Sequence, residues 1–265
     1  MPNWLLLIAE NPSMSETVFL AGATGAIGAA LVPLLVEAGY TVYGTTRRPE
    51  RAAVIEAMGA RPVVVDVFDR DTLTAAVARV EPTVVVHQLT DLPPGLDPQY
   101  MADAIGRNAR VREEGTANLV HAALAAGCLH IVAQSIAWAY ADGEKPYLET
   151  QPLDLAADGS RGITVRGVAA LERAVLGVGQ DDHQAAGAVL RYGNLYGPRT
   201  GRLERAGASP VHVEAAAWAT LLAVQLRATG VFNIAEDQAE VSSEKAKREL
   251  EWHPGMRLLL AQVQS

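Results

Sequence analysis

Gly22, Gly25 and Gly28 form a G-x-x-G-x-x-G pattern inside the stretch FLAGATGAIGAALVPLLVEAGY. A short apolar segment precedes the glycines and a helical pattern follows them, which is the setting of a phosphate-binding turn. There Gly22 permits the tight bend, Gly25 lets a pyrophosphate approach the backbone, and Gly28 lets the helix pack on the strand. The pattern therefore predicts a dinucleotide site, completed by the residues around the helix start: Thr24, Ala26 and Ile27. The alternative is a tight turn without a ligand.

The end of the second apolar segment, TVYGTTRRPE, bears on which dinucleotide binds. An Asp or Glu there would bind the ribose hydroxyls of NAD and repel a 2′-phosphate. The acidic position holds Thr46, and Arg47 and Arg48 follow it. Guanidinium groups suit phosphate, so NADP is favoured and NAD is the alternative, unless both arginines only open a solvated helix. Farther on, Asp66 and Val67 are placed to contact adenine, with Asp66 as a turn cap in the other interpretation.

Apolar runs alternate with helical patterns along the chain. Continuous Val, Ile and Leu in strands that are separated by helices favour a parallel sheet covered on both faces, a doubly wound α/β fold. The predicted strands cover residues 18–21, 41–45, 61–67, 83–89, 129–135, 187–193 and 230–235. The predicted helices cover residues 26–38, 49–58, 70–79, 101–126, 164–178, 213–227 and 242–250.

Composition limits the classes of function. Hydrophobic residues make up 49% of the 265, enough for a sizeable core, and the formal net charge of −8 argues against a nucleic-acid partner. The single cysteine, Cys128, excludes an internal disulfide and suggests a reducing compartment. The first hydrophobic run is too short to span a membrane, so we expect a cytoplasmic protein without a membrane partner. No His, Cys and Asp cluster has metal-ligand spacing, and no metal is expected.

The ordered segments GATGAIG, VVVDVFD, REEGTANLVHAALAAG, IVAQSIAWAY, VLRYGNLYGPRTG and HVEAAA resemble the short-chain dehydrogenase/reductase superfamily. The resemblance is to its extended or atypical branch, the NAD-dependent epimerase/dehydratase family. It implies a Rossmann domain over residues 14–200, whose last strand returns at 230–235, and a reduced C-terminal substrate lobe over 201–265. Residues 1–13, which precede Met14, are interpreted from the sequence itself as a tail. The resemblance also implies a small-molecule substrate, and a homodimer through helices 101–126 and 164–178.

The family's catalytic residues are only partly present. The resemblance implies that Ser135 orients the substrate oxygen, as a Ser or Thr after the fifth strand does in the family. The family's Tyr-x-x-x-Lys pair, which supplies the proton, is missing: aligning Glu172 places Thr164 and Val168 at the two positions. No lysine lies four residues after any of the seven tyrosines. General acid catalysis contributes typically about 10²–10⁴-fold, so another group must act or no carbonyl reduction occurs.

Few residues could replace the lost proton donor. Tyr140, five residues after Ser135, is the predicted catalytic phenol, although Lys145 nearby lies in an irregular loop. His87, at the end of the fourth strand, lies beside the cofactor and is an acid or a structural histidine. Asn194 belongs to the loop that resembles the family's nicotinamide-side turn.

Three functions stay open at this point. The first is an NAD(P)-dependent oxidoreductase or epimerase-like enzyme, with a non-standard proton donor and a small carbonyl, hydroxyl or sugar substrate. The second is an NADP-binding sensor or scaffold without turnover. The third is a non-redox isomerase, lyase or cyclase on the same scaffold.

Overall fold

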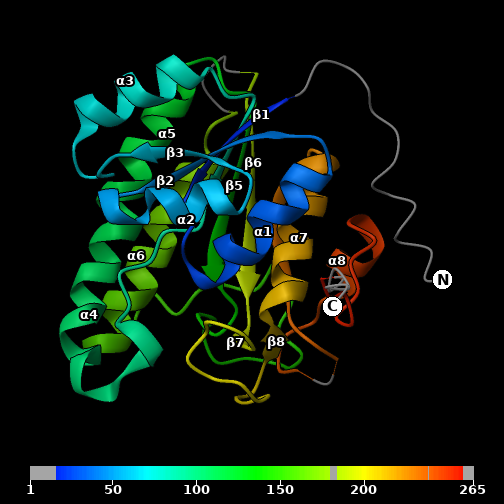
Figure 1. Cartoon of the computed structure of the whole chain (residues 1–265). Coiled ribbons are helices and arrows are strands. Elements are labelled where there is room, and N and C mark those ends of the chain that lie inside the picture. Colours follow the sequence, from blue (N-terminus) through cyan, green and yellow to red (C-terminus); the bar gives the residue numbers. More distant parts are fainter. Residues whose placement is uncertain (1–15, 180–183, 238, 259–265) are drawn as a thin grey trace.

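Seven parallel strands form the sheet at the centre of the protein (Figure 1). The computed structural model describes residues 16–179, 184–237 and 239–258. The strand order is β3-β2-β1-β4-β5-β6-β9, which reverses direction between β1 and β4, so the predicted doubly wound sheet is confirmed. The strands are β1 (Thr17–Ala21), β2 (Thr41–Thr46), β3 (Arg61–Val64), β4 (Val84–His87), β5 (His130–Ile136), β6 (Ala186–Tyr192) and β9 (Gly230–Ile234).

Helices cover both faces of this sheet. Successive side chains of β1 point to opposite faces: Val18 and Leu20 belong to one buried cluster, Phe19 and Ala21 to the other. The first cluster is closed by α1 (Ala26–Glu37), α2 (Ala52–Ala57) and α7 (Val213–Gln225), with α1 packed on α7. The second is closed by α3 (Arg70–Val80), α5 (Thr116–Ala125) and α6 (Gly159–Leu176).

The predicted helix over 101–126 is divided by one wide turn. The chain passes from α4 (Pro98–Arg110) through the π-helical turn η4 (Val111–Gly115) into α5. A Cβ on Gly115 would lie 3.2 Å from Cγ1 of Val67, and Asn118 Nδ2 donates to the Val67 carbonyl at 3.0 Å. These contacts hold the turn close to the end of β3, and no local sequence pattern had indicated them.

The chain after residue 200 contributes to the same sandwich. Both α7 and β9 belong to the sheet layers, and the remaining elements are shorter: η2 (Pro49–Arg51), η3 (Pro94–Leu96), β7 (Asn194–Tyr196), β8 (Pro210–His212) and α8 (Glu244–Glu249). The predicted division into a Rossmann domain over 14–200 and a C-terminal substrate lobe over 201–265 therefore stays a prediction. The predicted tail over 1–13 lies outside the described residues. In the part of the chain that the structure describes, no helix has the length and apolarity needed to cross a membrane.

Candidate active site

A cavity of about 1190 Å³ runs along the carboxyl ends of the strands. It begins at the glycine turn after β1, crosses the point where the strand order reverses, and continues past β5 and β6. Ligands of open α/β sheets bind in this crevice. Its first half is lined by Gly22, Thr24, Gly25, Ala26, Ile27, Arg47, Arg48, Arg51, Asp66, Val67 and Phe68.

The glycine turn leaves room for a phosphate at one position only. Gly22 has a φ of +95°, and a Cβ there would lie 2.6 Å from the Gln88 carbonyl oxygen. A Cβ on Gly28 would lie 2.2 Å from the Gly22 carbonyl oxygen, so Gly28 serves the packing of α1 and lies behind the cavity wall. Gly25 would meet only that same oxygen, at 3.4 Å, and it faces the cavity as the helix N-cap without a side-chain cap. The uncapped amides of α1 beside an open Gly25 fit a pyrophosphate.

The end of β2 carries cations at the cavity and no carboxylate of its own. Thr46 is buried, and its Oγ1 accepts from the Arg48 amide at 3.1 Å, so it fixes the loop. Arg48 is exposed at the cavity rim, and Nη2 of Arg47 lies 3.5 Å from Oδ1 of Asp91. Asp66 Oδ1 accepts from the Phe68 amide at 3.0 Å, as a turn cap does. Asp66 also lines the cavity, where the predicted adenine contact would be made.

His87 is a structural histidine in this geometry, which corrects its prediction as a cofactor contact. The residue is buried, and its Nδ1 accepts from the Leu89 amide at 3.2 Å, so Nε2 carries the proton and donates to Thr116 Oγ1 at 2.9 Å. Burial, and then the charge of Arg112, lowers the pKa of His87 to about 4. His87 is therefore neutral at pH 7, and it joins β4 to α5 behind the cavity.

Ser135 is held away from the cavity, contrary to its predicted role. Its Oγ donates to Oε1 of Glu172 at 2.7 Å, while its neighbours Gln134 and Ile136 line the cavity. Glu172 is also bound by Arg191, whose Nη2 lies 2.7 Å from Oε2, and all three residues are buried. Ser135 itself is not among the residues that line the cavity, because its hydroxyl is turned to Glu172 of α6.

Tyr140 belongs to the same buried network and does not reach the cavity either. Its hydroxyl donates to Oδ1 of Asn233 at 2.7 Å, and the Arg191 guanidinium lies 4.8 Å from its ring centroid. Burial raises the pKa of Tyr140. Lys145 pairs instead with Glu240 at the surface, so the predicted Tyr140 acid has neither access to the cavity nor help from Lys145.

Comparison with known proteins decides the family. The model of the NAD-dependent epimerase/dehydratase family matches residues 18–250. The chain belongs to the NAD-dependent epimerase/dehydratase family. It is thus an enzyme of an oxidoreductase and epimerase family with an NAD(P)-binding fold, and neither a sensor nor a non-redox enzyme finds support among its relatives.

Its relatives include reductases and dehydrogenases. A Streptomyces protein named 3-diazoavenalumate denitrifying reductase is 40% identical over 242 residues, which are 83% of this chain and 76% of that protein. The Dictyostelium discoideum sterol-4-alpha-carboxylate 3-dehydrogenase, decarboxylating, is 32% identical over only 27% of this chain and 21% of its own.

Solved structures show the same fold at lower identity. The Thermotoga maritima UDP-glucose 4-epimerase with UDP-glucose has a TM-score of 0.72 at 19% identity, covering 91% of this chain and 94% of that one. The Stenotrophomonas maltophila UDP-glucose-4-epimerase with bound NAD and formylated UDP-arabinopyranose has a TM-score of 0.74 at 18% identity and the same coverage.

Gln134, Ile136 and Thr164 line one side of the cavity, which we call the reacting wall. None of these side chains is a tyrosine or a lysine. Thr164, predicted from the sequence to stand at the position of the family tyrosine, lines the cavity, and Val168, one turn on, is fully buried. Asn194 lines the opposite side, and its Oδ1 accepts from the Ser209 amide at 3.4 Å. Of the described lining residues, none is lysine or histidine, and the one tyrosine, Tyr100, is 52% exposed on α4.

The second half of the cavity contains residues that the sequence interpretation missed. Its wall is largely apolar and includes Leu92, Leu96, Met101, Ile105, Ile136, Trp138 and Leu195. Five arginines also line it: Arg107, Arg112, Arg161, Arg199 and Arg202. The Pro- and Asp-rich loop after β4 was a signal for the part that Leu92 and Leu96 supply, and no sequence pattern indicated the rest.

Proposed function

We propose that the protein is an NADPH-dependent reductase of an apolar organic acid whose reacting group needs no proton from the enzyme. The observation that carries the proposal is the combination of an open phosphate turn at Gly25 with a reacting wall of Gln134, Ile136 and Thr164. Threonine and glutamine have no pKa suitable for proton transfer at neutral pH. Carbonyl groups become alkoxides when they accept a hydride and need a proton, so this enzyme would reduce them slowly.

A diazo compound meets this requirement. The name of the Streptomyces relative describes reductive removal of nitrogen from a diazo-bearing carboxylate. When an arenediazonium carbon accepts a hydride, the C–H bond forms, the C–N bond breaks, and its electron pair leaves with N₂. The reduced nicotinamide becomes oxidised, and charge balances without any proton. Loss of the family's proton donor is then compatible with turnover, and the second half of the cavity serves to bind and orient the substrate.

The cofactor proposed is NADPH, with NADH as the alternative. Thr46 stands where a carboxylate would repel the 2′-phosphate, and Arg47 and Arg48 follow it at the cavity. When bound, the dinucleotide supplies the hydride. The chain's own part is to hold the pyrophosphate on the amides of Ala26 and Ile27, and to exclude water from the apolar wall.

The substrate proposed is an aromatic or otherwise flat acid. Ile136, Trp138 and Met101 offer an apolar surface, and Trp138 is 44% exposed toward the cavity mouth. Arg199 and Arg202 lie in the loop after β7 that borders the same half, where cations attract a carboxylate. The arginines make this half of the cavity positively charged, although the formal net charge of the whole protein is −8.

The test uses diazotised 3-amino-4-hydroxybenzoate, whose ortho oxygen stabilises the diazo group in water. With NADPH we expect oxidation of the cofactor, release of one N₂ per NADPH and formation of 4-hydroxybenzoate, all faster than with NADH. UDP-glucose and a simple aromatic aldehyde serve as comparators. Interconversion of UDP-glucose and UDP-galactose, or faster reduction of the aldehyde than of the diazo acid, would overturn the proposal.

A homodimer through the helices over 101–126, now α4, η4 and α5, and over 164–178, within α6, remains part of the proposal, as does a cytoplasmic location. The two helices pack against each other within one chain. Ile163 on α6 is 41% exposed, which leaves an apolar side chain for a second copy to cover. Sedimentation of the wild type and of Ile163→Glu tests this: a dimer that the substitution dissociates supports it, and a wild-type monomer contradicts it.

A further inference from the structure

Arg112 is a partly enclosed cation at the cavity, and no ion-pair partner for it lies among the described residues. It lies in the π-helical turn η4, lines the cavity and is only partly exposed. Within residues 16–179, 184–237 and 239–258, no carboxylate, hydroxyl or carbonyl bonds to its guanidinium. Burial alone lowers its pKa, to about 10, so it stays charged at neutral pH.

The other arginines that line the cavity are either exposed to water, as are Arg48, Arg51, Arg199 and Arg202, or lie near a carboxylate. Nε of Arg107 lies 3.7 Å from Oδ2 of Asp91, and Nε of Arg161 lies 2.7 Å from Oδ2 of Asp154. Arg161 also donates to backbone carbonyls. A guanidinium that is largely removed from water and has no such neighbour is destabilising. Arg112 therefore indicates that an anion completes this part of the cavity during function.

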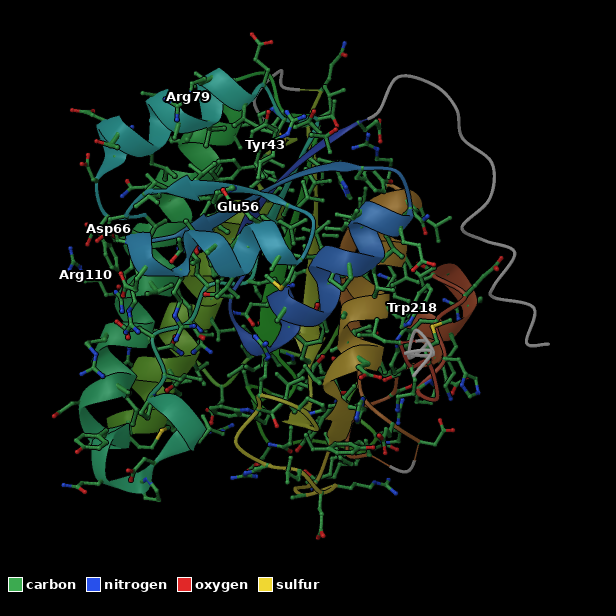
Figure 2. The ribbon with its side chains drawn as sticks, viewed as in Figure 1. Tyr43, Glu56, Asp66, Arg79, Arg110 and Trp218 are labelled. Atoms are coloured by element: carbon green, nitrogen blue, oxygen red, sulfur yellow. The ribbon has the colours of Figure 1, made fainter. Side chains whose placement is uncertain are left out.

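The local structure aims this cation inward. Arg110, two residues earlier, points to the outer surface near Asp66, where Nε of Arg110 pairs with Glu114 at 2.7 Å (Figure 2). Two residues along a helix rotate a side chain to roughly the opposite side, so Arg112 faces the sheet. π-Helical turns of this kind occur often at functional sites. Thr116, which follows the turn, is tied to His87 at the end of β4.

The position of Arg112 is also where the two halves of the cavity meet. His87 ends β4, next to the reversal of strand order, and its pKa is lowered in part by the charge of Arg112. Val111 and Asn108, from the same stretch of chain, line the cavity beside it. The nucleotide half lies on one side of this point and the apolar half on the other.

We propose that Arg112 is a specificity-determining residue that binds an anionic oxygen of the substrate. The proposal rests on the proposed function. The guanidinium offers several donors to a carboxylate, or to the phenolate oxygen beside a diazo carbon. With no proton donor at the wall, a fixed cation is the means by which this chain stabilises negative charge on the substrate. No proton is transferred by Arg112.

The experiment compares Arg112→Gln, Arg112→Lys and a control, Arg79→Gln. Arg79 is exposed on α3 and does not line the cavity (Figure 2). Steady-state constants are measured with the diazo acid of the preceding section and with its methyl ester. Affinities of each variant for NADPH, and of its NADP⁺ complex for 4-hydroxybenzoate, are measured by calorimetry. The last measurement reports binding without turnover.

We expect Arg112→Gln to lower kcat/KM for the acid roughly 10- to 100-fold, the range of a lost charge-assisted hydrogen bond. Affinity for 4-hydroxybenzoate should fall in parallel, NADPH affinity should stay within about twofold, and Arg112→Lys should recover part of the loss. If the ester suffers the same loss, the phenolate oxygen is the contact; if it suffers none, the carboxylate is.

Two results would overturn the inference. One is an unchanged kcat/KM and an unchanged affinity for 4-hydroxybenzoate in Arg112→Gln. The other is a loss confined to NADPH affinity, which would make Arg112 a cofactor contact. A wild-type enzyme that does not reduce the diazo acid is a different failure, because it rejects the proposed function while the binding of 4-hydroxybenzoate still tests Arg112.

Discussion

Ser135 donates its hydroxyl hydrogen to Glu172 of α6, 2.7 Å away, and does not line the cavity. The residue that resembles a catalytic serine is thus part of a buried charge network with Arg191. We expect Ser135→Ala to lower the free energy of unfolding by about 1.5–3 kcal/mol, the cost of one buried hydrogen bond to a charged group. Turnover should change by less than about threefold, because this bond does not involve the reacting atoms.

Urea unfolding and steady-state kinetics on the same preparation measure both effects. Thr164→Ala is the companion variant, since Thr164 does line the cavity. A hundredfold loss of kcat in Ser135→Ala, with stability retained, would restore the serine to the catalytic machinery and contradict this placement.

The glycine turn allows a paired test of binding against packing. Gly25 has a φ of −73°, which any residue adopts, and a Cβ there projects toward the cavity. Gly25→Val should therefore fold with a stability within about 1 kcal/mol of the wild type, and lose most dinucleotide affinity. Gly28→Ala should instead destabilise by about 2–3 kcal/mol, because its Cβ would meet the Gly22 carbonyl at 2.2 Å. Calorimetric titration with NADPH and thermal unfolding separate the two, and equal stability losses would count against the assigned roles.

Cofactor choice is expected to depend on the end of β2. Arg48→Gln should weaken NADPH binding roughly tenfold and leave NADH binding nearly unchanged, because one charge-assisted contact to the 2′-phosphate is lost. Arg70→Gln, an exposed arginine at the start of α3, is the matched control. Equal weakening of both dinucleotides by Arg48→Gln would mean that Arg48 contacts a feature that they share.

Acid should destabilise the protein through His87. Its pKa is about 6.5 in the unfolded chain and about 4 in the fold, so the unfolded state binds more protons between these values. The contribution of His87 is complete above pH 6.5 and is lost as the pH falls toward 4, by up to about 3 kcal/mol. His87→Gln should flatten this part of the stability profile, measured by urea unfolding at several pH values. A profile equally steep in the variant would show that other groups cause the acid sensitivity.

The glycine turn, the parallel sheet and most helix positions could be predicted because each depends on a local pattern. The spacing of Gly22, Gly25 and Gly28 and the apolar runs of β1 and β4 are such patterns. The environment of Ser135 could not be predicted in this way. It depends on Glu172 and Arg191, which are distant in the sequence.

Arg112 could not be found for the same reason. A helical pattern over 101–126 does not reveal that contacts between Gly115 and Val67 accompany a wide turn. Nor does the sequence show which of the many arginines lacks a carboxylate nearby, since Asp91 serves Arg47 and Arg107 from another loop. Thr164, which the family resemblance predicts at the position of the missing proton donor, lines the cavity, yet the resemblance could not supply a replacement donor.

The central claim is that hydride passes from the dinucleotide to a substrate carbon without a proton from the enzyme. The most direct measurement uses NADPH deuterated on one face of nicotinamide C4, with the diazotised 3-amino-4-hydroxybenzoate in ordinary water. One of the two stereospecifically labelled cofactors should place a single deuterium on the ring carbon that lost N₂, and unlabelled NADPH in D₂O should place none there. Solvent deuterium at that carbon would contradict the account.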